Sequence, residues 1–478
     1  MEEMKRPHIV CIPLPAQGHI NPMMQLAKIL HSRGFFITFV HTDCVHKRLS
    51  TLDSLVCSDG FRFEVISDGL SPSFGEVKEG PEDFLQSVKE NCVAPFRDLL
   101  RKLHRPSDGH RVTCVVSDAF MTFTLKVAEE VGIPEVIFCP TAACGFMAIA
   151  QYRELMRRGL VPLKDESCIG NGYLDTAIDW IPGMRDIRLR DLGSCLQTTD
   201  PNDFIVNFLA DEAQNTSTAS AIIFNTFDDL EDEVLQAIKS IFPPCIYTIG
   251  PLSLQFRLLP DNVLKSATAS MWKEEAECLK WLDSHEAASV IFVNFGSSTV
   301  FTENQLIEFA LGIVHSKYPF LWVIRPNLVM GGCPNLPQEL MDEIGGRGML
   351  AGWCPQEEVL AHPSIAIFLT HCGWNSTLQS ISFGVPMLCW PFSWEQQTNC
   401  KYACQEWGVG VEIDTNAKGK EIEALIKEIM GEEKRKEMRK KALKWKESAQ
   451  TAIKEGGSSH TNLEILSQEL LQSGDFSN

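Results

Sequence analysis

The sequence lacks the short motifs that mark several large classes of nucleotide-binding and hydrolytic enzymes. No GxGxxG follows its first apolar run, and neither GxxxxGKS/T nor GxSxG occurs in it. These absences disfavour a dinucleotide-dependent dehydrogenase, a P-loop NTPase and an α/β-hydrolase, because each depends on its motif to bind phosphate or to place a nucleophile. An Asp-x-Asp pair is also missing, so the sequence offers no obvious carboxylate ligands for a metal-held nucleotide sugar.

Positive charge and long apolar runs are also scarce. The 478 residues include 43 Lys and Arg against 62 Asp and Glu, which gives a formal net charge of −19. That balance disfavours a nucleic-acid partner, which needs a basic face, and it disfavours adsorption to anionic lipid. No stretch reaches the roughly 18 to 20 apolar residues of a membrane span, and the first residues lack the apolar core of a signal peptide. We therefore expect a cytoplasmic, monomeric protein without stable membrane insertion.

Cysteine is plentiful, but its pattern is not that of a disulfide framework or a metal site. The 17 cysteines are odd in number, are scattered along the chain and form no CxxC pair. This is typical of free, mostly buried thiols in a reducing compartment. His371 and Cys372, even with His362, do not have the spacing of metal ligands. We therefore expect no bound metal ion.

Short apolar runs alternate with amphipathic stretches in both halves of the chain. The first run, residues 8–14, precedes a helical stretch over 22–32, for which Asn21 is a fair N-cap and Pro22 suits the first turn. Further strands are expected at residues 35–40, 112–116, 136–139, 221–225, 246–249, 290–295, 320–324, 349–351, 365–370 and 387–390. Helices are expected over 119–131, 303–314, 376–383 and 396–408. This spacing predicts parallel βαβ units.

The alternation lapses between the two halves, and this lapse indicates two domains. We expect an N-terminal domain over residues 1–254, a linker over 255–275 and a C-terminal domain over 276–459. Each would be a doubly wound α/β domain. Because such sheets bind ligands beyond the carboxyl ends of their strands, polar residues that directly follow strands are the candidates for a functional site.

His19 and Asp118 are two such residues. His19 lies between the first strand and the first helix, where it could act as a general base near neutral pH or simply form a loop hydrogen bond. Asp118 ends a later strand, where it could orient a histidine and balance its charge, or cap the following helix. The two functional roles fit together, because a carboxylate fixes the tautomer of a basic histidine.

The densest group of polar and aromatic residues lies between Trp353 and Gln396. A strand ending at Thr370 is followed by His371-Cys372-Gly373-Trp374-Asn375-Ser376, which opens a helix. A helix N-terminus with such side chains binds anions, so His371, Asn375 and Ser376 could donate to a diphosphate. Trp353 could stack on a nucleobase, or it could belong to the core.

This segment resembles the signature of the plant family 1 UDP-glycosyltransferases. The resemblance extends to the Gly18-His19 turn, to Ser117-Asp118 and to residues 293–297, so it covers nearly the whole chain. It implies the GT-B fold, with two Rossmann-like α/β domains and mainly parallel sheets facing a central cleft. It also implies that the C-terminal helix, about residues 460–478, packs on the N-terminal domain. Family members need no metal ion and no cofactor besides the UDP-sugar co-substrate.

The resemblance also implies residue roles. His19 would deprotonate the acceptor hydroxyl with help from Asp118, and the oxygen would displace UDP with inversion of the anomeric carbon. The residues expected to bind the UDP-sugar are Ser297, Trp353, Cys354, Gln356, His371, Gly373, Trp374, Asn375, Ser376, Gln379, Glu395, Gln396 and Thr141. Within this set, Trp353 would stack on uracil, and Trp374, Glu395 and Gln396 would hold the sugar. Gln396 at the last signature position resembles members that use glucose.

Two positions depart from the family pattern. Gln379 stands where most members have a Glu that holds both ribose hydroxyls, and Glu395 stands where Asp is commoner. An amide forms weaker hydrogen bonds to hydroxyls than a carboxylate, so we expect a loss of about 1–2 kcal/mol in donor binding from Gln379. Glu395 keeps the charge on a longer side chain. The hypothesis is that Gln379 weakens donor binding without abolishing it.

The sequence thus predicts transfer of glucose from UDP-glucose to a hydroxyl of a small lipophilic acceptor, such as a flavonoid, a terpenoid or another phenol or alcohol. Apolar residues in 120–123, 138–147 and 179–190 either line the acceptor pocket or belong to the core. Alternatives are the use of another UDP-sugar, formation of a C-glycoside, and a donor-binding protein whose turnover is reduced because of Gln379. The acceptor-binding residues follow no pattern that the sequence reveals.

Overall fold

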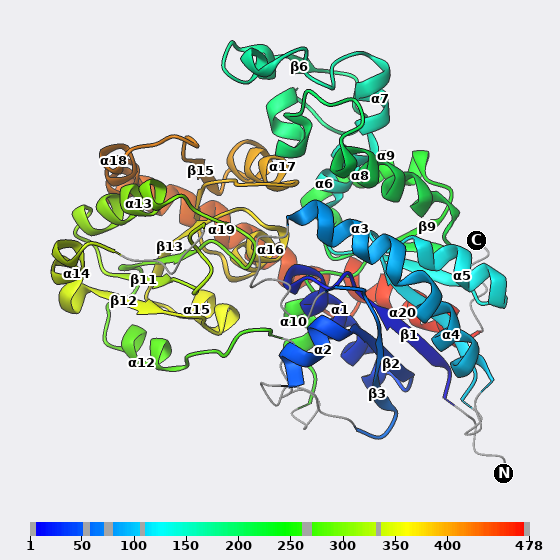
Figure 1. Cartoon of the computed structure of the whole chain (residues 1–478). Helices are drawn as coiled ribbons and strands as arrows, with labels where there is room; N and C mark the ends of the chain where they lie inside the picture. The colour runs from blue at the N-terminus through cyan, green and yellow to red at the C-terminus, as the bar shows by residue number, and fades with distance from the viewer. Residues whose placement is uncertain are drawn as a thin grey trace. The chain divides into compact units, whose positions relative to one another are not determined.

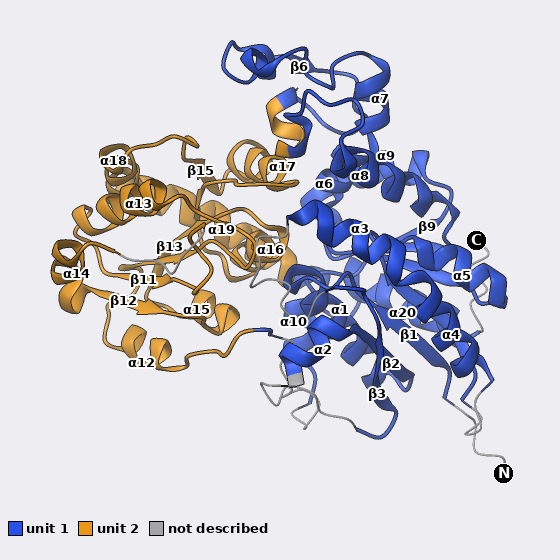
Figure 2. Ribbon diagram, viewed as in Figure 1, with its two compact units in different colours: residues 1–189, 195–271, 451–478 blue, residues 190–194, 272–450 orange. Residues whose placement is uncertain are grey.

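Two compact units make up the chain (Figure 2). The computed structural model describes residues 6–50, 58–70, 80–105, 110–260, 270–330 and 336–472. Unit 1 comprises residues 1–189, 195–271 and 451–478, and unit 2 comprises residues 190–194 and 272–450. Each has a parallel sheet with surrounding helices, which confirms the predicted α/β class. The expected domain boundaries stay predictions, and residues 261–269 of the expected linker and 473–478 of the expected C-terminal helix lie outside the described residues.

The main sheet of unit 1 has its switch point between β1 and β4. The strands are β1 (His8–Ile12), β2 (Phe36–Thr42), β3 (Phe61–Ile66), β4 (Val112–Asp118), β5 (Glu135–Cys139), β8 (Ala221–Phe224) and β9 (Cys245–Thr248). They are parallel in the order β3-β2-β1-β4-β5-β8-β9, and Figure 1 labels β1, β2, β3 and β9. Ile12 pairs with Ser117, so the carboxyl ends of β1 and β4 lie side by side. Doubly wound sheets bind their ligands at such a point.

Helices pack against this sheet through a shared apolar core. They are α1 (Gln17–Ser32), α2 (Asp43–Ser50), α3 (Pro81–Asn91), α4 (Val93–His104), α5 (Phe123–Val131), α6 (Ala143–Ala150), α7 (Tyr152–Arg157), α8 (Phe204–Asn215), α9 (Asp228–Ile241), α10 (Leu252–Arg257) and α20 (Ser458–Leu471). One cluster combines apolar side chains of α1, the sheet and α20, including Leu26, Phe138 and Leu466. The C-terminal helix is held further by Ser459, whose hydroxyl donates to the Gly250 carbonyl at 2.6 Å. A two-stranded antiparallel ribbon, β6 (Ala177–Ile178) with β7 (Ile187–Arg188), completes the sheets of this part of the chain.

The sheet of unit 2 repeats the same arrangement. Its strands are β10 (Val290–Asn294), β11 (Phe320–Val323), β12 (Gly348–Ala351), β13 (Ile365–Thr370), β14 (Met387–Cys389) and β15 (Gly410–Glu412), all parallel in the order β12-β11-β10-β13-β14-β15. The switch point lies between β10 and β13, where Asn294 pairs with Thr370. The helices are α12 (Glu277–Asp283), α13 (Glu303–His315), α14 (Gln338–Ile344), α15 (Gln356–Ala361), α16 (Trp374–Phe383), α17 (Gln396–Lys401), α18 (Gly419–Met430) and α19 (Glu432–Ala452). A short π-helix, η7 (Tyr402–Glu406), continues α17.

An aromatic cluster supports the loops at the carboxyl edge of this sheet. Phe295 and Trp390 directly follow β10 and β14, and their rings meet edge to face at a centroid distance of 5.6 Å. Phe301 stacks on Trp390 at 5.0 Å, and Phe309 of α13 closes the group. All four residues are almost fully buried. Aromatic pairs contribute about 0.5–1.5 kcal/mol beyond their buried area, so these loops leave the sheet from a rigid base.

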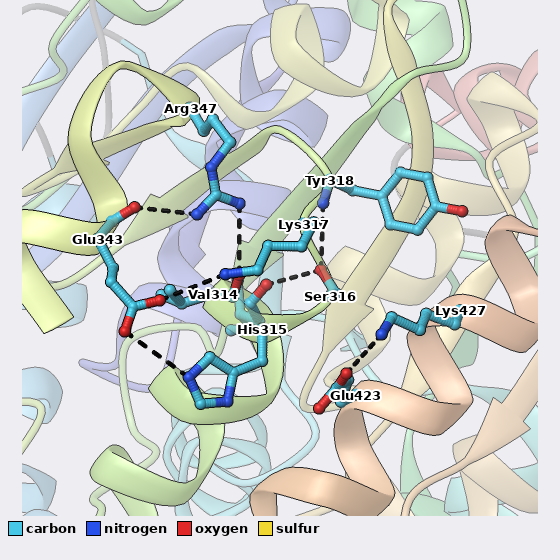
Figure 3. A network of polar contacts seen from close by, with 10 residues as sticks. Val314, His315, Ser316, Lys317, Tyr318, Glu343, Arg347, Glu423 and Lys427 are labelled. Carbon is cyan, nitrogen blue, oxygen red and sulfur yellow. Dashed lines mark hydrogen bonds and ion pairs between the residues drawn. The ribbon is translucent and has the colours of Figure 1, made fainter.

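The end of α13 is closed by a polar network (Figure 3). Arg347 donates to the Val314 carbonyl at 3.3 Å and to the Glu343 carbonyl at 2.9 Å. The Glu343 carboxylate accepts from Lys317 at 3.3 Å and lies 3.9 Å from His315. Cations near the last helical carbonyls stabilise a helix C-terminus. The network thereby fixes the turn from α13 into β11.

Two predicted helix starts are wrong. The first helix begins at Gln17, five residues before the predicted position at Pro22, so Pro22 lies inside α1 and Asn21 is not its N-cap. Extended backbone at Ala16, whose carbonyl accepts from the amides of His19 and Ile20, starts the helix instead. The predicted helix over 119–131 begins only at Phe123, because residues 119–122 form turns that follow β4.

Among the residues that the structure describes, no helix combines the length and the hydropathy needed to cross a lipid bilayer.

Candidate active site

His19 and Asp118 meet at the switch point of unit 1. His19 is the third residue of α1, and its Nδ1 lies 2.8 Å from Oδ2 of Asp118, the last residue of β4. The other carboxylate oxygen of Asp118 accepts from the Phe120 amide at 3.0 Å. The pairing of β1 with β4 therefore brings together two residues that are 99 positions apart in the sequence.

The surroundings of this pair suit proton transfer. The Asp118 side chain is fully buried, whereas the His19 side chain keeps 20% of its surface exposed. The ring of Phe120 lies edge-on to the imidazole at 5.6 Å. Because Nδ1 donates to the carboxylate, the basic lone pair of the neutral imidazole is placed on Nε2. A buried carboxylate also stabilises the imidazolium that forms when Nε2 takes a proton.

Two further buried carboxyl groups, which the sequence reasoning missed, hold the end of β4. Glu135 accepts from the hydroxyls of Ser117 and Thr124, both at 2.5 Å, and burial raises the pKa of Glu135 to about 8. Glu212 accepts from the Thr122 amide at 2.8 Å, and burial raises the pKa of Glu212 to about 7. A charged residue at the head of an otherwise apolar strand, as at Glu135, is the signal that could have drawn attention to it.

His371 marks the switch point of unit 2. It directly follows β13 and is 8% exposed. Its ring lies between two glycines: a Cβ built on Gly296 or on Gly373 would come within 2.5 Å of the imidazole. Gly296 also has a φ of +68°, which other residues rarely adopt. These two glycines therefore leave the space that the histidine occupies.

The charge state of His371 differs from that of a typical surface histidine. Burial, together with the nearby positive charge of Arg325, lowers the pKa of His371 to about 4. The imidazole is therefore neutral at pH 7 and acts as a hydrogen-bonding group rather than as a cation. It resembles the amide and hydroxyl groups that follow it in α16.

Arg325 and Asn294, which the sequence reasoning missed, shape the loop that carries Ser297. The buried guanidinium of Arg325 donates to the carbonyls of Gly296 at 3.0 Å, Asn327 at 2.7 Å and Thr299. Asn294 accepts from the Gly296 amide at 3.0 Å. Arg325 follows β11 and Asn294 ends β10, so the rule that singled out His19 and Asp118 applies to them as well.

The N-terminus of α16 is tied to α15 and β10 through Gln356. Gly373 is the N-cap of α16, and Asn375 and Ser376 lie in its first turn. Gln356 donates to the Ser376 hydroxyl at 3.0 Å and accepts from the Asn294 amide group at 2.7 Å. The unsatisfied backbone N–H groups of a helix N-terminus, with such side chains beside them, form an anion site.

Gln379 belongs to the same network. Its Oε1 accepts from Gln356 at 2.7 Å, and its Nε2 donates to Oε1 of Glu357 at 3.1 Å. The position therefore has a carboxylate neighbour, although it carries an amide itself. Glu357 was not singled out from the sequence.

The remaining residues expected to bind the UDP-sugar lie in four further places. Trp353 is half-buried and stacks on Trp272 at 5.8 Å, and Cys354 beside it is buried. The side chain of Trp374 is buried and lies 6.1 Å from the ring of Trp407.

Glu395 is the N-cap of α17, and Gln396 accepts from the amides of Phe392 at 2.9 Å and Ser393 at 3.0 Å. The turn that holds them includes Trp394 at a φ of +60°, a costly conformation for a bulky residue. Thr141 lies in unit 1, where its buried hydroxyl is 3.1 Å from the Cys139 thiol.

Comparisons with known proteins agree over nearly the full length. A family model described as UDP-glucoronosyl and UDP-glucosyl transferase matches residues 62–445. The 7-deoxyloganetin glucosyltransferase of Gardenia jasminoides is 53% identical over 470 residues, which cover 97% of this chain and 98% of that protein. The (R)-mandelonitrile beta-glucosyltransferase of Prunus dulcis is 50% identical over 477 residues, covering 98% and 99%. The structure of Phytolacca americana UGT2 complexed with UDP-2fluoro-glucose and pterostilbene gives a TM-score of 0.81 at 28% identity, covering 98% of this chain and 100% of that chain.

Proposed function

Since this chain belongs to the family of UDP-glucuronosyl and UDP-glucosyl transferases, we propose that it transfers glucose from UDP-glucose to a hydroxyl group of a small lipophilic acceptor. It is a UDP-glycosyltransferase with the GT-B fold. Two of its relatives are named as glucosyltransferases, of 7-deoxyloganetin and of (R)-mandelonitrile, which supports glucose as the sugar and a small hydroxyl compound as the acceptor.

The observation that carries the proposed mechanism is the 2.8 Å contact between His19 and the buried carboxylate of Asp118. The acceptor hydroxyl gives its proton to Nε2 of His19 while its oxygen forms a bond to the anomeric carbon of the donor. The bond from that carbon to the UDP oxygen breaks on the opposite face, so an α-linked donor yields a β-glycoside. Asp118 keeps the imidazole in the basic tautomer and balances its positive charge after proton transfer.

The donor diphosphate is bound in this proposal by neutral groups rather than by a basic patch. His371, Asn375 and Ser376 donate hydrogen bonds at the N-terminus of α16, and the loop that Arg325 holds contributes Ser297. Donors fixed before the reaction stabilise the charge that develops on the leaving phosphate oxygen. This local arrangement fits a chain whose net charge of −19 disfavours long-range attraction of an anion.

The remaining residues bind the uridine and the sugar of UDP-glucose in this proposal. Uracil stacks on Trp353, with Gln356 and the backbone of Cys354 along the uridine. Gln379 contacts the ribose, and Glu357 beside it supplies a carboxylate. The sugar hydroxyls are held by Glu395, by Gln396, by the backbone N–H of Trp374 beyond the N-cap Gly373, and by Thr141. The Trp374 ring is packed on Trp407, which is why its backbone is assigned this role.

The test is a product assay with UDP-glucose and a panel of small alcohols, cyanohydrins and phenols. Mass spectrometry reports transfer of a hexose, and the coupling constant of the anomeric proton distinguishes a β- from an α-glycoside. We expect β-glucosides of at least one class of hydroxyl compound. Transfer without inversion, or UDP release without any glycoside product, would contradict the proposal.

A further inference from the structure

Four cysteines from four different elements come together in unit 2. Cys372 lies between β13 and α16, Cys389 ends β14, Cys400 is in α17 and Cys404 is in η7. The first three are at most 1% exposed, and Cys404 is half-buried. We call these residues the cysteine cluster.

Three sulfur atoms of the cluster are close enough to share one ligand, and the fourth lies beside two of them. The Sγ atoms of Cys372, Cys389 and Cys400 all lie within 4.8 Å of one another. The Sγ of Cys404 is 3.9 Å from that of Cys400, and it also contacts the thiol of Cys389. Gly410 closes the group, since a Cβ at this position would come within 3.0 Å of the sulfurs of both Cys389 and Cys404. The backbone around the cluster thus leaves room for the four sulfurs.

Neither redox chemistry nor ordinary core packing accounts well for this arrangement. Reactive cysteines are exposed, whereas Cys372, Cys389 and Cys400 are at most 1% exposed. Core packing explains one or two buried thiols, but it does not require three sulfurs that all lie close to one another with a fourth beside two of them. Apolar side chains of the same volume would fill the space without weakly polar atoms.

We propose that the cysteine cluster binds one Zn²⁺ ion through four thiolates. Tetrahedral zinc with four sulfur ligands needs sulfur–sulfur separations of about 3.8 Å, close to the 3.9 Å between Cys400 and Cys404. The sulfurs of Cys372, Cys389 and Cys400, which are separated by up to 4.8 Å, need to approach one another by about 1 Å at most, and the Cys404 sulfur must also move toward Cys372. Each thiol gives its proton to solvent as its sulfur binds the metal, so affinity rises with pH. The site is structural, because four protein ligands leave no open position on zinc.

The cluster adjoins the proposed donor site through Cys372. This residue follows His371, has a φ of +64°, and accepts a hydrogen bond on its carbonyl from Asn399 at 2.9 Å. A metal ion on its sulfur would hold the loop from β13 to α16 in one conformation. Resting on the proposed function, this predicts that UDP binds more tightly to the zinc-loaded protein than to the metal-free protein.

Metal titration of the full chain, purified with a reductant and freed of metal, tests the proposal. We expect one equivalent of Zn²⁺ to bind in competition with a chromophoric chelator. Co²⁺ should give an intense thiolate-to-cobalt charge-transfer band that Zn²⁺ abolishes. Cys389→Ser and Cys404→Ser should each weaken Zn²⁺ binding by at least about tenfold, since a ligand is lost. Cys168→Ser, which removes a buried thiol of unit 1, should bind Zn²⁺ as the wild type does.

Two results would overturn the zinc site: no stoichiometric binding, or unchanged affinity in both cluster variants. The Cys404 variant serves if Cys389→Ser does not fold, because Cys404 is only half-buried. Calorimetry of UDP binding with and without Zn²⁺ then tests the link to the donor site. Equal UDP affinities would remove that link and leave the metal site standing, whereas absence of UDP binding in both forms would refute the proposed function instead.

Discussion

His19 and His371 each lie at the switch point of a doubly wound sheet, one in each unit, yet their surroundings differ in exposure and in neighbouring charge. Each histidine follows a strand at the switch point of a doubly wound sheet, β1 in unit 1 and β13 in unit 2. His19 is partly exposed and bonded to the buried carboxylate of Asp118. His371 is buried between two glycines near the guanidinium of Arg325.

This difference shows that the same side chain at the same edge of a sheet takes its role from its neighbours. A carboxylate 2.8 Å from Nδ1 of His19 favours the tautomer whose basic lone pair is on Nε2, as the proposed base requires. Burial and a nearby cation lower the pKa of His371 to about 4, so this imidazole stays neutral at pH 7. The position along the fold selects candidate residues, and the local charge decides between a base and a binding group.

Replacement of the Asp118 carboxylate should have the largest effect on turnover. Asp118→Asn keeps the side-chain size and the acceptor for the Phe120 amide, but it removes the charge that balances the imidazolium. We expect kcat to fall by about 100- to 10,000-fold with little change in the donor KM. Steady-state kinetics with the acceptor from the product assay measures both constants. A loss confined to KM would mean that Asp118 positions substrate and does not support a base.

Gly296, one of the two glycines beside His371, should matter mainly for UDP binding. In Gly296→Ala the new Cβ would lie 2.5 Å from the imidazole and displace it, so we expect UDP to bind about tenfold more weakly. Gly345→Ala is the matched control: Gly345 also has a positive φ, but a Cβ there meets nothing within 4 Å. Isothermal calorimetry with UDP compares the two variants. If both variants bound UDP with the same affinity, any loss of UDP affinity would come from backbone strain and not from displacement of His371.

Exchanging the amide of Gln379 and the carboxylate of Glu357, which are proposed to lie near the ribose, should have a smaller effect on the binding of UDP-glucose. Gln379→Glu alone sets two carboxylates beside each other, because Gln379 already donates to Glu357. The double variant Glu357→Gln with Gln379→Glu moves the charge onto α16 without this repulsion. We expect it to lower the KM for UDP-glucose by about fivefold relative to wild type, and the single variant to gain less. A KM that is unchanged or higher in the double variant would refute the idea that Gln379 weakens donor binding.

Glu135→Gln should have the smallest effect on turnover and is the control for Asp118→Asn, since both convert a buried carboxyl to an amide. The raised pKa of Glu135, about 8, means that its contribution to stability is fully present below the unfolded pKa of 4.5 and is lost as the pH rises through about 8. Between pH 5 and pH 8 we expect the variant to gain at least about 1 kcal/mol in free energy of unfolding relative to wild type. Denaturant unfolding at pH 5 and pH 8 measures this change in free energy. If Glu135→Gln lost turnover as Asp118→Asn does, the loss of turnover would not be specific to Asp118.

Much of the scaffold and part of the site could be predicted from the sequence. Buried parallel strands are continuously apolar, so apolar runs such as residues 112–116 and 365–370 could be predicted as strands. They lie in β4 and β13. The rule that ligands bind beyond carboxyl strand ends led to His19 and Asp118, which the structure brings into contact. The roles of individual donor-site residues came from the family resemblance and remain proposals.

What could not be predicted depends on contacts between distant elements. Pro22 indicated a helix start, but the backbone at Ala16 begins α1 earlier. Arg325 matters because its guanidinium donates to the carbonyl of Gly296 in another loop. The cysteine cluster joins parts of the chain that are far apart in the sequence, and only Cys400 and Cys404 have a short spacing. For Arg325 and the cysteine cluster, the sequence carries the residue but not its partner, because the partner is set by sheet order.

The most direct test of the account is a parallel measurement of turnover and of UDP affinity in His19→Ala. If His19 is the base, kcat with a hydroxyl acceptor falls by about 100- to 10,000-fold, while the Kd for UDP stays within about twofold of the wild-type value. Turnover at the wild-type rate in this variant would contradict the assignment of His19 as the base.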